Sequence, residues 1–216
     1  FIMVQSVLAA DAVYAERDKV YDFIKTNMMG RSVGFHMVQN SPSAKLQYDF
    51  TRKVTFANLQ KSDQGLSYDE IIEIKQKNTD IDDEGRVIAG NPVVTQDRTL
   101  VIRMYVTQSA ATGKLKGFTQ VVSNSNMKTD SLSSSDTVSL LTVQDGALVG
   151  KRFTALYADF FAAGGKYEAG RAEQEMKIAV ENGKLVSETK VTQWRVNPDT
   201  LEPTTDKEVN TMSERE

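Results

Sequence analysis

Residues 137–196 read TVSLLTVQDGALVGKRFTALYADFFAAGGKYEAGRAEQEMKIAVENGKLVSETKVTQWRV, with three pairs of turn-forming residues between long alternating segments. The pairs are Asp145-Gly146, Gly164-Gly165 and Asn182-Gly183. Such pairs supply the positive φ angles that two-residue type I′ hairpins need. The stretch therefore predicts an antiparallel meander of four strands, in which each turn sets the register of its own hairpin.

The register predicts which side chains share a face. Counting outward from Asn182-Gly183 places Lys177 opposite Glu188 and Arg171 opposite Trp194. Directly opposed ion pairs indicate a solvent-facing side. The other two turns, counted in the same way, place Phe153 opposite both Met176 and Val138. The predicted inner face, common to the three hairpins, carries Val138, Leu140, Phe153, Tyr157, Met176, Ile178, Val180, Leu185 and Val191.

One inward row combines opposite charges. The predicted register brings Asp159, Gly170 and Arg195 side by side on three adjacent strands. The outer two strands are about 9–10 Å apart, and glycine leaves the space between them open. Two interpretations follow: a structural ion pair that closes one end of a barrel, or an arginine that fixes an anionic group of a ligand.

Composition limits the classes of function. The chain has 216 residues, 40% of them hydrophobic, a formal charge of −3 and no cysteine. An acidic chain without a basic run does not suit a nucleic-acid surface. Without cysteine there is no disulfide, zinc–thiolate site, iron–sulfur cluster or cysteine nucleophile. No apolar run reaches the 18 residues expected of a transmembrane helix, and no motif indicates a cofactor.

The N-terminal residues have two interpretations. Residues 1–12 end in Ala10-Asp11-Ala12 after an apolar stretch, which fits a signal-peptide remnant with an A-x-A cleavage site. The alternative is an apolar lead-in to a helix over residues 12–29. Asp11 would be the N-cap of that helix and Gly30 its stop, and its buried stripe would be Val13, Val20, Ile24 and Met28, with Phe23 at the edge. Residues 13–216 would then form a single β-barrel domain.

The middle of the chain predicts further strands over residues 31–39, 46–60, 66–77, 98–109 and 116–123, about nine or ten in total. Arg52 interrupts an apolar face between Phe50 and Val54, and Glu70 does the same beside Tyr68. Because these two strands are joined by a short loop, we expect Arg52 and Glu70 to lie within a few residues of each other across the pair.

Three other features have simple alternatives. Residues 80–85 carry carboxylates and a glycine at calcium-loop spacing, but Asn91 stands where the bidentate glutamate belongs, so an acidic turn is the alternative. His36 is the only histidine, a surface or core residue unless it is a haem ligand or general base. The serine-rich residues 123–136 predict an exposed connection, or a lid over a barrel mouth.

A leading helix, a glycine-containing first strand, a long meander and a late inward Arg195 resemble the lipocalin-like (calycin) β-barrels. That family carries a G-x-W motif after its first helix; here Gly30 and Gly34-Phe35 occupy the region without a tryptophan. Trp194 lies on another strand. The resemblance implies a periplasmic or secreted protein that holds a small, mostly apolar ligand inside its barrel.

The sequence thus leads to three hypotheses. The first is binding or carriage of a small, largely apolar ligand such as a lipid, with or without an anionic head group, by a closed barrel or an open half-barrel. The second is a barrel enzyme, an isomerase or hydrolase, that uses Tyr157, Asp159 or Glu70. The third is a structural envelope protein with a packed lumen. The expected ligand-binding residues are Tyr48, Phe50, Arg52, Phe56, Tyr68, Glu70, Phe153, Tyr157, Asp159, Met176 and Arg195.

Overall fold

The computed structural model describes residues 14–89, 94–125, 135–159, 168–197, 200 and 202–216. The predicted signal remnant and Asp11 lie outside these residues. The described part holds one α-helix, one 3-10 turn and ten strands. Their bounds are α2 Ala15–Asn27, β1 Ser32–Ser41, η1 Pro42–Ala44, β2 Leu46–Lys61, β3 Gly65–Asp80, β4 Val94–Gln108, β5 Leu115–Asn124, β6 Ser135–Gln144, β7 Ala147–Asp159, β8 Glu168–Glu181, β9 Lys184–Val196 and β10 Pro203–Arg215.

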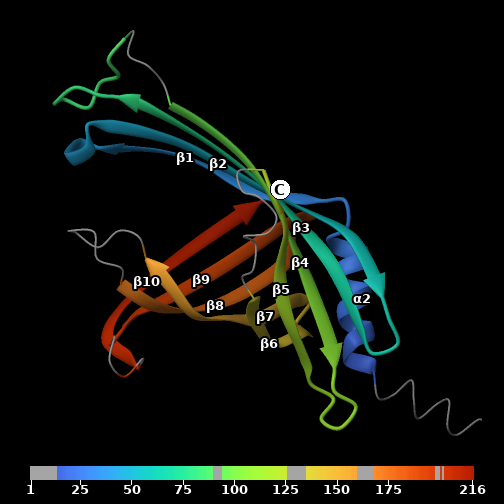
Figure 1. Cartoon of the computed structure of the whole chain (residues 1–216). Helices are drawn as coiled ribbons and strands as arrows, with labels where there is room; N and C mark the ends of the chain where they lie inside the picture. The colour runs from blue at the N-terminus through green and yellow to red at the C-terminus, as the bar shows by residue number, and fades with distance from the viewer. Residues whose placement is uncertain (1–13, 90–93, 126–134, 160–167, 198–199, 201) are drawn as a thin grey trace, which may run out of the picture.

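The strands form a nearly closed antiparallel barrel (Figure 1). Each strand pairs with the next along the chain, and β1 returns to β10. The closing contact is short, with Gly34 opposite Arg215 as its register pair. A β-carbon on Gly34 would lie 2.4 Å from the backbone oxygen of Arg52, so only glycine fits at this position of β1 beside β2. The predicted meander barrel with a leading helix is confirmed.

The β8–β9 hairpin has its predicted register. Asn182 and Gly183 have φ values of 51° and 79°, as a type I′ turn requires. Lys177 pairs with Glu188, and Arg171 pairs with Trp194. The inner face of this hairpin includes Ile178, which is buried, whereas Val180 at the tip is exposed.

The predicted register of the β7–β8 hairpin is wrong. Phe153 pairs with Glu173 instead of Met176, and an irregularity follows between Thr154 and Tyr157. The last described pair is Asp159 with Glu168, two residues from the predicted pair of Asp159 with Gly170, and the predicted Gly164-Gly165 turn lies outside the described residues. A slip by an odd number of residues exchanges the two faces of a strand.

The β6–β7 hairpin is correct at its turn and wrong beyond it. Asp145 and Gly146 have positive φ, and Gln144 pairs with Ala147 as expected. A bulge between Ser139 and Thr142 then shifts the register by one residue, so Val138 pairs with Arg152 and not with Phe153. A bulge adds a residue to one strand, which an alternation pattern alone does not reveal.

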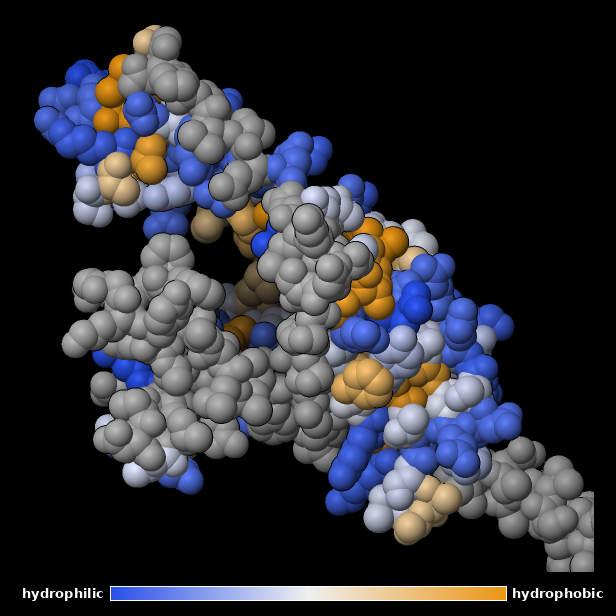
Figure 2. Space-filling model, viewed as in Figure 1, coloured by the Kyte–Doolittle hydropathy of each residue, from blue (hydrophilic) through white to orange (hydrophobic). Residues whose placement is uncertain are grey.

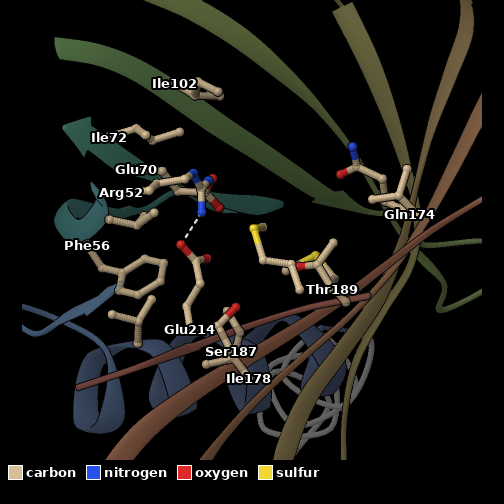
Figure 3. Close-up of a pocket in the computed structure, with 15 residues that line it drawn as sticks. Arg52, Phe56, Glu70, Ile72, Ile102, Gln174, Ile178, Ser187, Thr189 and Glu214 are labelled. Carbon is tan, nitrogen blue, oxygen red and sulfur yellow. Dashed lines mark hydrogen bonds and ion pairs between the residues drawn. The ribbon is translucent and has the colours of Figure 1, made fainter. Parts of the chain in front are cut away.

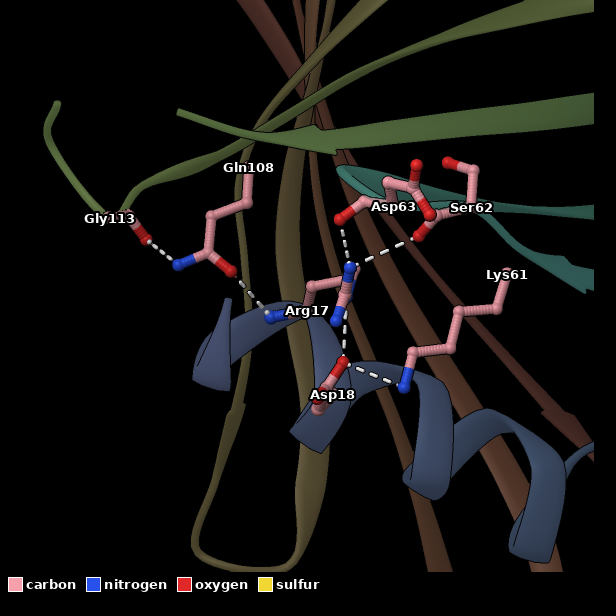
Figure 4. A network of polar contacts seen from close by, with 7 residues as sticks. All are labelled: Arg17, Asp18, Lys61, Ser62, Asp63, Gln108 and Gly113. Atoms are coloured by element: carbon pink, nitrogen blue, oxygen red, sulfur yellow. Dashed lines mark hydrogen bonds and ion pairs between the residues drawn. The ribbon is translucent and has the colours of Figure 1, made fainter. Parts of the chain in front are cut away.

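Helix α2 closes the end of the barrel where the β2–β3 and β4–β5 hairpins turn (Figures 1 and 4). Val20, Ile24 and Met28 have no exposed surface, as their predicted stripe requires. Full burial of a side chain of this size contributes about 1.5–3 kcal/mol. Gly30 follows with a φ of 74°, which lets the chain leave the helix and enter β1.

Arg17 ties α2 to the barrel, a role that the sequence did not indicate. Its side chain donates to the backbone oxygens of Ser62 and Asp63, and its backbone N–H donates to Oε1 of Gln108 at 3.0 Å (Figure 4). Asp18 accepts from Arg17 at 2.7 Å and pairs with Lys61 at 2.9 Å. These contacts hold the helix across two hairpin tips, so this end of the barrel is closed by packing and by polar contacts together.

Candidate functional site

A cavity of about 220 Å³ lies inside the barrel, beyond the core that packs on α2 (Figure 3). Its described lining comes from β1, β2, β3, β4, β8, β9 and β10, so it is enclosed by strands distant in sequence. Most of the wall is apolar: Val33, Val54, Phe56, Ile72, Ile102, Met176, Ile178, Val191 and Met212. Figure 2 shows the molecule hollowed beside the β1–β2 strands, with hydrophobic residues along the hollow.

An ion pair lies in the wall of this cavity. Nη1 of Arg52, on β2, donates to Oε1 of Glu214, on β10. The two side chains are 20% and 5% exposed, so both are largely withdrawn from water. Because β2 and β10 flank β1 in the barrel, the pair bridges the short closing contact from the inside.

A second carboxylate lies beside the pair. Glu70, on β3, is 8% exposed and lines the same cavity (Figure 3). Burial raises the pKa of Glu214; the Arg52 guanidinium opposes this, and the charge of Glu70 adds to the increase. Desolvation therefore outweighs the ion pair, which is the expected balance when a charge leaves water with only one strong partner.

Neutral polar groups line the opposite wall. Gln174 and Thr189 lie across the cavity from Arg52 and Glu70, and Ser187 lies below them (Figure 3). Ser187 and Thr189 alternate along β9, so both point inward from one strand. An apolar wall with a few placed polar groups is the general design of a small-molecule site.

Four of the expected ligand-binding residues line this cavity: Arg52, Phe56, Glu70 and Met176. The expectation that Arg52 and Glu70 lie together is confirmed, although Arg52 pairs across the strands with Ile74 and Glu70 with Phe56.

Other expected residues lie elsewhere. Tyr48 and Phe50 precede Arg52 on β2 and are half-buried; the ring of Phe50 lies 5.6 Å from that of Phe35. Tyr68 is fully buried in the hydrophobic core that contacts α2, so it packs the barrel and is not among the described lining residues.

The predicted row of Asp159, Gly170 and Arg195 is wrong. Gly170 pairs with Arg195 as expected, but its partner on β7 is Tyr157, whereas Asp159 pairs with Glu168. Arg195 itself is exposed. The β7–β8 register from which the pair of Asp159 and Arg195 was predicted is therefore shifted by two residues at this end. The side chain of Asp159 lies outside the described part of the structure, so the pair itself stays a prediction.

Glu214 is the charged residue of the site that sequence reasoning missed, along with Ser187, Thr189 and Met212. Its only local signal is that it follows Met212 by two residues, which puts the two on one strand face. The alternation is weak because the residues between Lys207 and Arg215 are mostly polar. Its role becomes visible only when the barrel closes and brings β10 within reach of β2.

A second arginine–carboxylate cluster lies on the outer face. Asp69 is 2% exposed and accepts from Nε and Nη2 of Arg103 at 2.7 and 2.9 Å, and from Asn58 at 2.8 Å. Asn58 has a φ of 55° beside a bulge in β2. The hydrogen bonds from Arg103 lower the pKa of Asp69 and outweigh burial, with a further contribution from Asn58.

The acidic loop and the histidine have simple partners. Asp82 accepts from the backbone N–H groups of Glu84 and Arg86 and from the Arg86 guanidinium, so this segment is an ion-paired turn. Nε2 of His36 lies 2.7 Å from Oδ1 of Asp49, and both side chains are exposed. Within the described residues, no three histidine, cysteine or acidic side chains gather as metal ligands would.

Comparisons with known proteins leave the family open. Searches against models of protein families, curated proteins and solved structures each found no match. In the part of the chain that the structure describes, no helix is both long and apolar enough to span a bilayer.

Proposed function

We propose that this protein binds a small, largely apolar molecule inside its barrel. The observation that carries the proposal is the cavity itself: about 220 Å³, walled by nine apolar side chains and a few inward polar groups among the described residues. Sites for drug-sized ligands measure about 300–1,000 Å³. The cavity thus suits a smaller molecule, or the apolar part of a longer one.

The barrel is compatible with a lipocalin-like fold, which supports the same proposal. The long antiparallel meander and the single leading helix agree with that architecture. The late Arg195 does not, because it is exposed. A periplasmic or secreted setting remains a prediction that follows from this likeness.

A packed structural barrel and a barrel enzyme are the competing proposals. A packed lumen would fill the space between Ile72 and Ile178 with side chains, whereas a cavity is present there. An enzyme would need a nucleophile or a base with an activating partner. Glu70 and Glu214 are the carboxylates of the described lining, and Glu214 is held by Arg52. The apolar wall and the Arg52–Glu214 pair therefore support a binding cavity more than a catalytic site.

Two methionines give a direct test. Met176 and Met212 line the cavity, whereas Met29 packs against the core next to α2. Titration of methyl-labelled protein with 1-octanol should shift the methyl signals of Met176 and Met212 in a saturable way and leave Met29 unchanged. Equal shifts at all three, or none at saturating octanol, would contradict a binding cavity.

A matched pair of variants on β9 completes the test. Thr189 lines the cavity, and Lys190 is exposed on the opposite face of the strand. Thr189→Trp should fill the cavity and abolish the octanol-dependent shifts, whereas Lys190→Trp should retain them. Both variants should keep the wild-type far-ultraviolet circular dichroism, so that lost binding is separated from lost structure.

A further inference from the structure

We infer that the ligand of this cavity is an amphiphile with a cationic head group, such as a primary ammonium, and not a fatty acid. The inference rests on the proposed function, since it names the chemistry of a ligand for the same cavity. It departs from the expectation that Arg52 would receive an anionic head group, because Glu214 already occupies that guanidinium.

The charges of the cavity favour a cation. Among its described lining residues are the carboxylates of Glu70 and Glu214 and a single guanidinium, that of Arg52. All three come from neighbouring parts of the wall (Figure 3). An acidic excess in a site withdrawn from water attracts an opposite charge more strongly than the same groups would in solvent.

A ligand carboxylate would face the opposite situation. It would meet two acidic side chains and compete with Glu214 for Arg52, and displacement of Glu214 would leave a buried carboxylate without its partner. Burial raises the pKa of Glu214 and the charge of Glu70 raises it further, so Glu70 repels the ionised form of Glu214. An ammonium placed near them relieves that repulsion.

The rest of the wall suits an alkyl chain. Val54, Phe56, Ile72 and Ile178 surround the space beside the charged groups. A guanidinium or ammonium ligand with a short apolar body therefore satisfies both parts of the cavity.

Three ligands of equal chain length separate the outcomes. Octylamine, 1-octanol and octanoate would each be titrated at pH 7, with the Met176 and Met212 methyl signals as the readout. We expect octylamine to bind most tightly and octanoate least, with about a tenfold or larger ratio, because one charge-assisted hydrogen bond is worth about 1.5–3 kcal/mol. Any other order overturns the inference. Binding of all three in another order leaves the proposed function standing, whereas no binding of any overturns both.

Two variants test the assignment of the charges. Glu70→Gln should reduce the ratio of octylamine to octanoate affinity about tenfold. The matched control Glu73→Gln, an exposed position on the same strand, should leave the ratio unchanged. Glu214→Gln releases Arg52 and should raise octanoate affinity. Wild-type ratios in both Glu70→Gln and Glu214→Gln would overturn the inference, and the circular dichroism spectrum of each variant confirms its fold.

Discussion

The two faces of the barrel each hold a buried carboxylate paired with arginine, yet the two carboxylates behave in opposite ways. On the outer face, Asp69 accepts three hydrogen bonds from Arg103 and Asn58, and its pKa is lowered. On the inner face, Glu214 pairs with Arg52 beside a second acid, and burial raises its pKa. The surroundings of the outer acid favour its ionised form, whereas burial and a neighbouring acid disfavour the ionised form of the inner one.

The opposite pKa shifts of Asp69 and Glu214 indicate a structural role for one cluster and a binding role for the other. A buried acid with enough donors stabilises the ionised form and needs nothing further. A buried acid next to another acid and an open cavity is stabilised by any cation that enters. We therefore assign the Asp69 cluster to the folding of the β2 bulge, and the Arg52–Glu214–Glu70 cluster to binding.

Removal of the inner arginine should have the largest effect on stability. Arg52→Met leaves Glu214 buried beside Glu70 without a partner, which should lower the free energy of unfolding by about 3–5 kcal/mol at pH 7. The pKa of Glu214 would then be raised further above its unfolded value. The associated stability is present below the unfolded pKa and lost as pH rises through the folded pKa, so the deficit should shrink toward pH 4. Urea unfolding at pH 7 and pH 4 measures this. A deficit that is the same at both values would contradict the account of Glu214.

Removal of the outer acid should be milder, and its deficit should persist to lower pH than that of Arg52→Met. Asp69→Asn should lower the free energy of unfolding by about 2–3 kcal/mol, because charge-assisted bonds are lost while Arg103 still reaches water. The lowered pKa of Asp69 gives stability that is present above the unfolded pKa and is lost as pH falls through the folded pKa. The deficit should therefore disappear in acid, and urea unfolding from pH 7 to pH 2 follows it. Octylamine affinity should not change; a reduced affinity would show that the two faces are not separate.

The smallest effect is expected at the pair of Arg31, which precedes β1, and Glu216, which follows β10. The guanidinium of Arg31 and the backbone N–H of Leu185 lower the pKa of Glu216 to about 2. Glu216→Gln should slightly lower stability at pH 7 and flatten the loss of stability between pH 4.5 and pH 2, because that loss follows protonation of the folded carboxylate. Acid unfolding followed by tryptophan fluorescence measures the slope. An unchanged slope would show that this contact does not help to close the barrel.

The parts of the fold that depend on local chemistry were predictable from the sequence. Asn182-Gly183 and Asp145-Gly146 form the expected turns because few residues tolerate positive φ. The stripe of α2 was correct because apolar residues at helical spacing have one way to be buried. The strand that carries Arg52, Val54 and Phe56 placed all three in the cavity, since alternation is preserved along that stretch of β2.

Features that depend on closure of the barrel were not predictable. Phe153 lies opposite a residue three positions from its predicted partner: two positions of this slip are already present at the Asp159–Glu168 pair, and the irregularity between Thr154 and Tyr157 adds the third. No residue in that strand marks it. Glu214 contacts Arg52 across 162 positions in sequence, a contact that no local pattern contains. The candidate site was therefore predicted in part. Strand patterns indicated the apolar wall and Arg52, whereas only the fold shows that Arg52 pairs with Glu214.

The most direct measurement is the position of a ligand in the barrel. Crystals grown with 8-bromooctylamine would locate the bromine by its anomalous scattering. The account predicts a bromine within the cavity, beside residues such as Ile72 and Ile178, with the ammonium nitrogen at hydrogen-bond distance from Glu70 or Glu214. A bromine bound only on the outer surface, or an ammonium group directed away from both carboxylates, would contradict it.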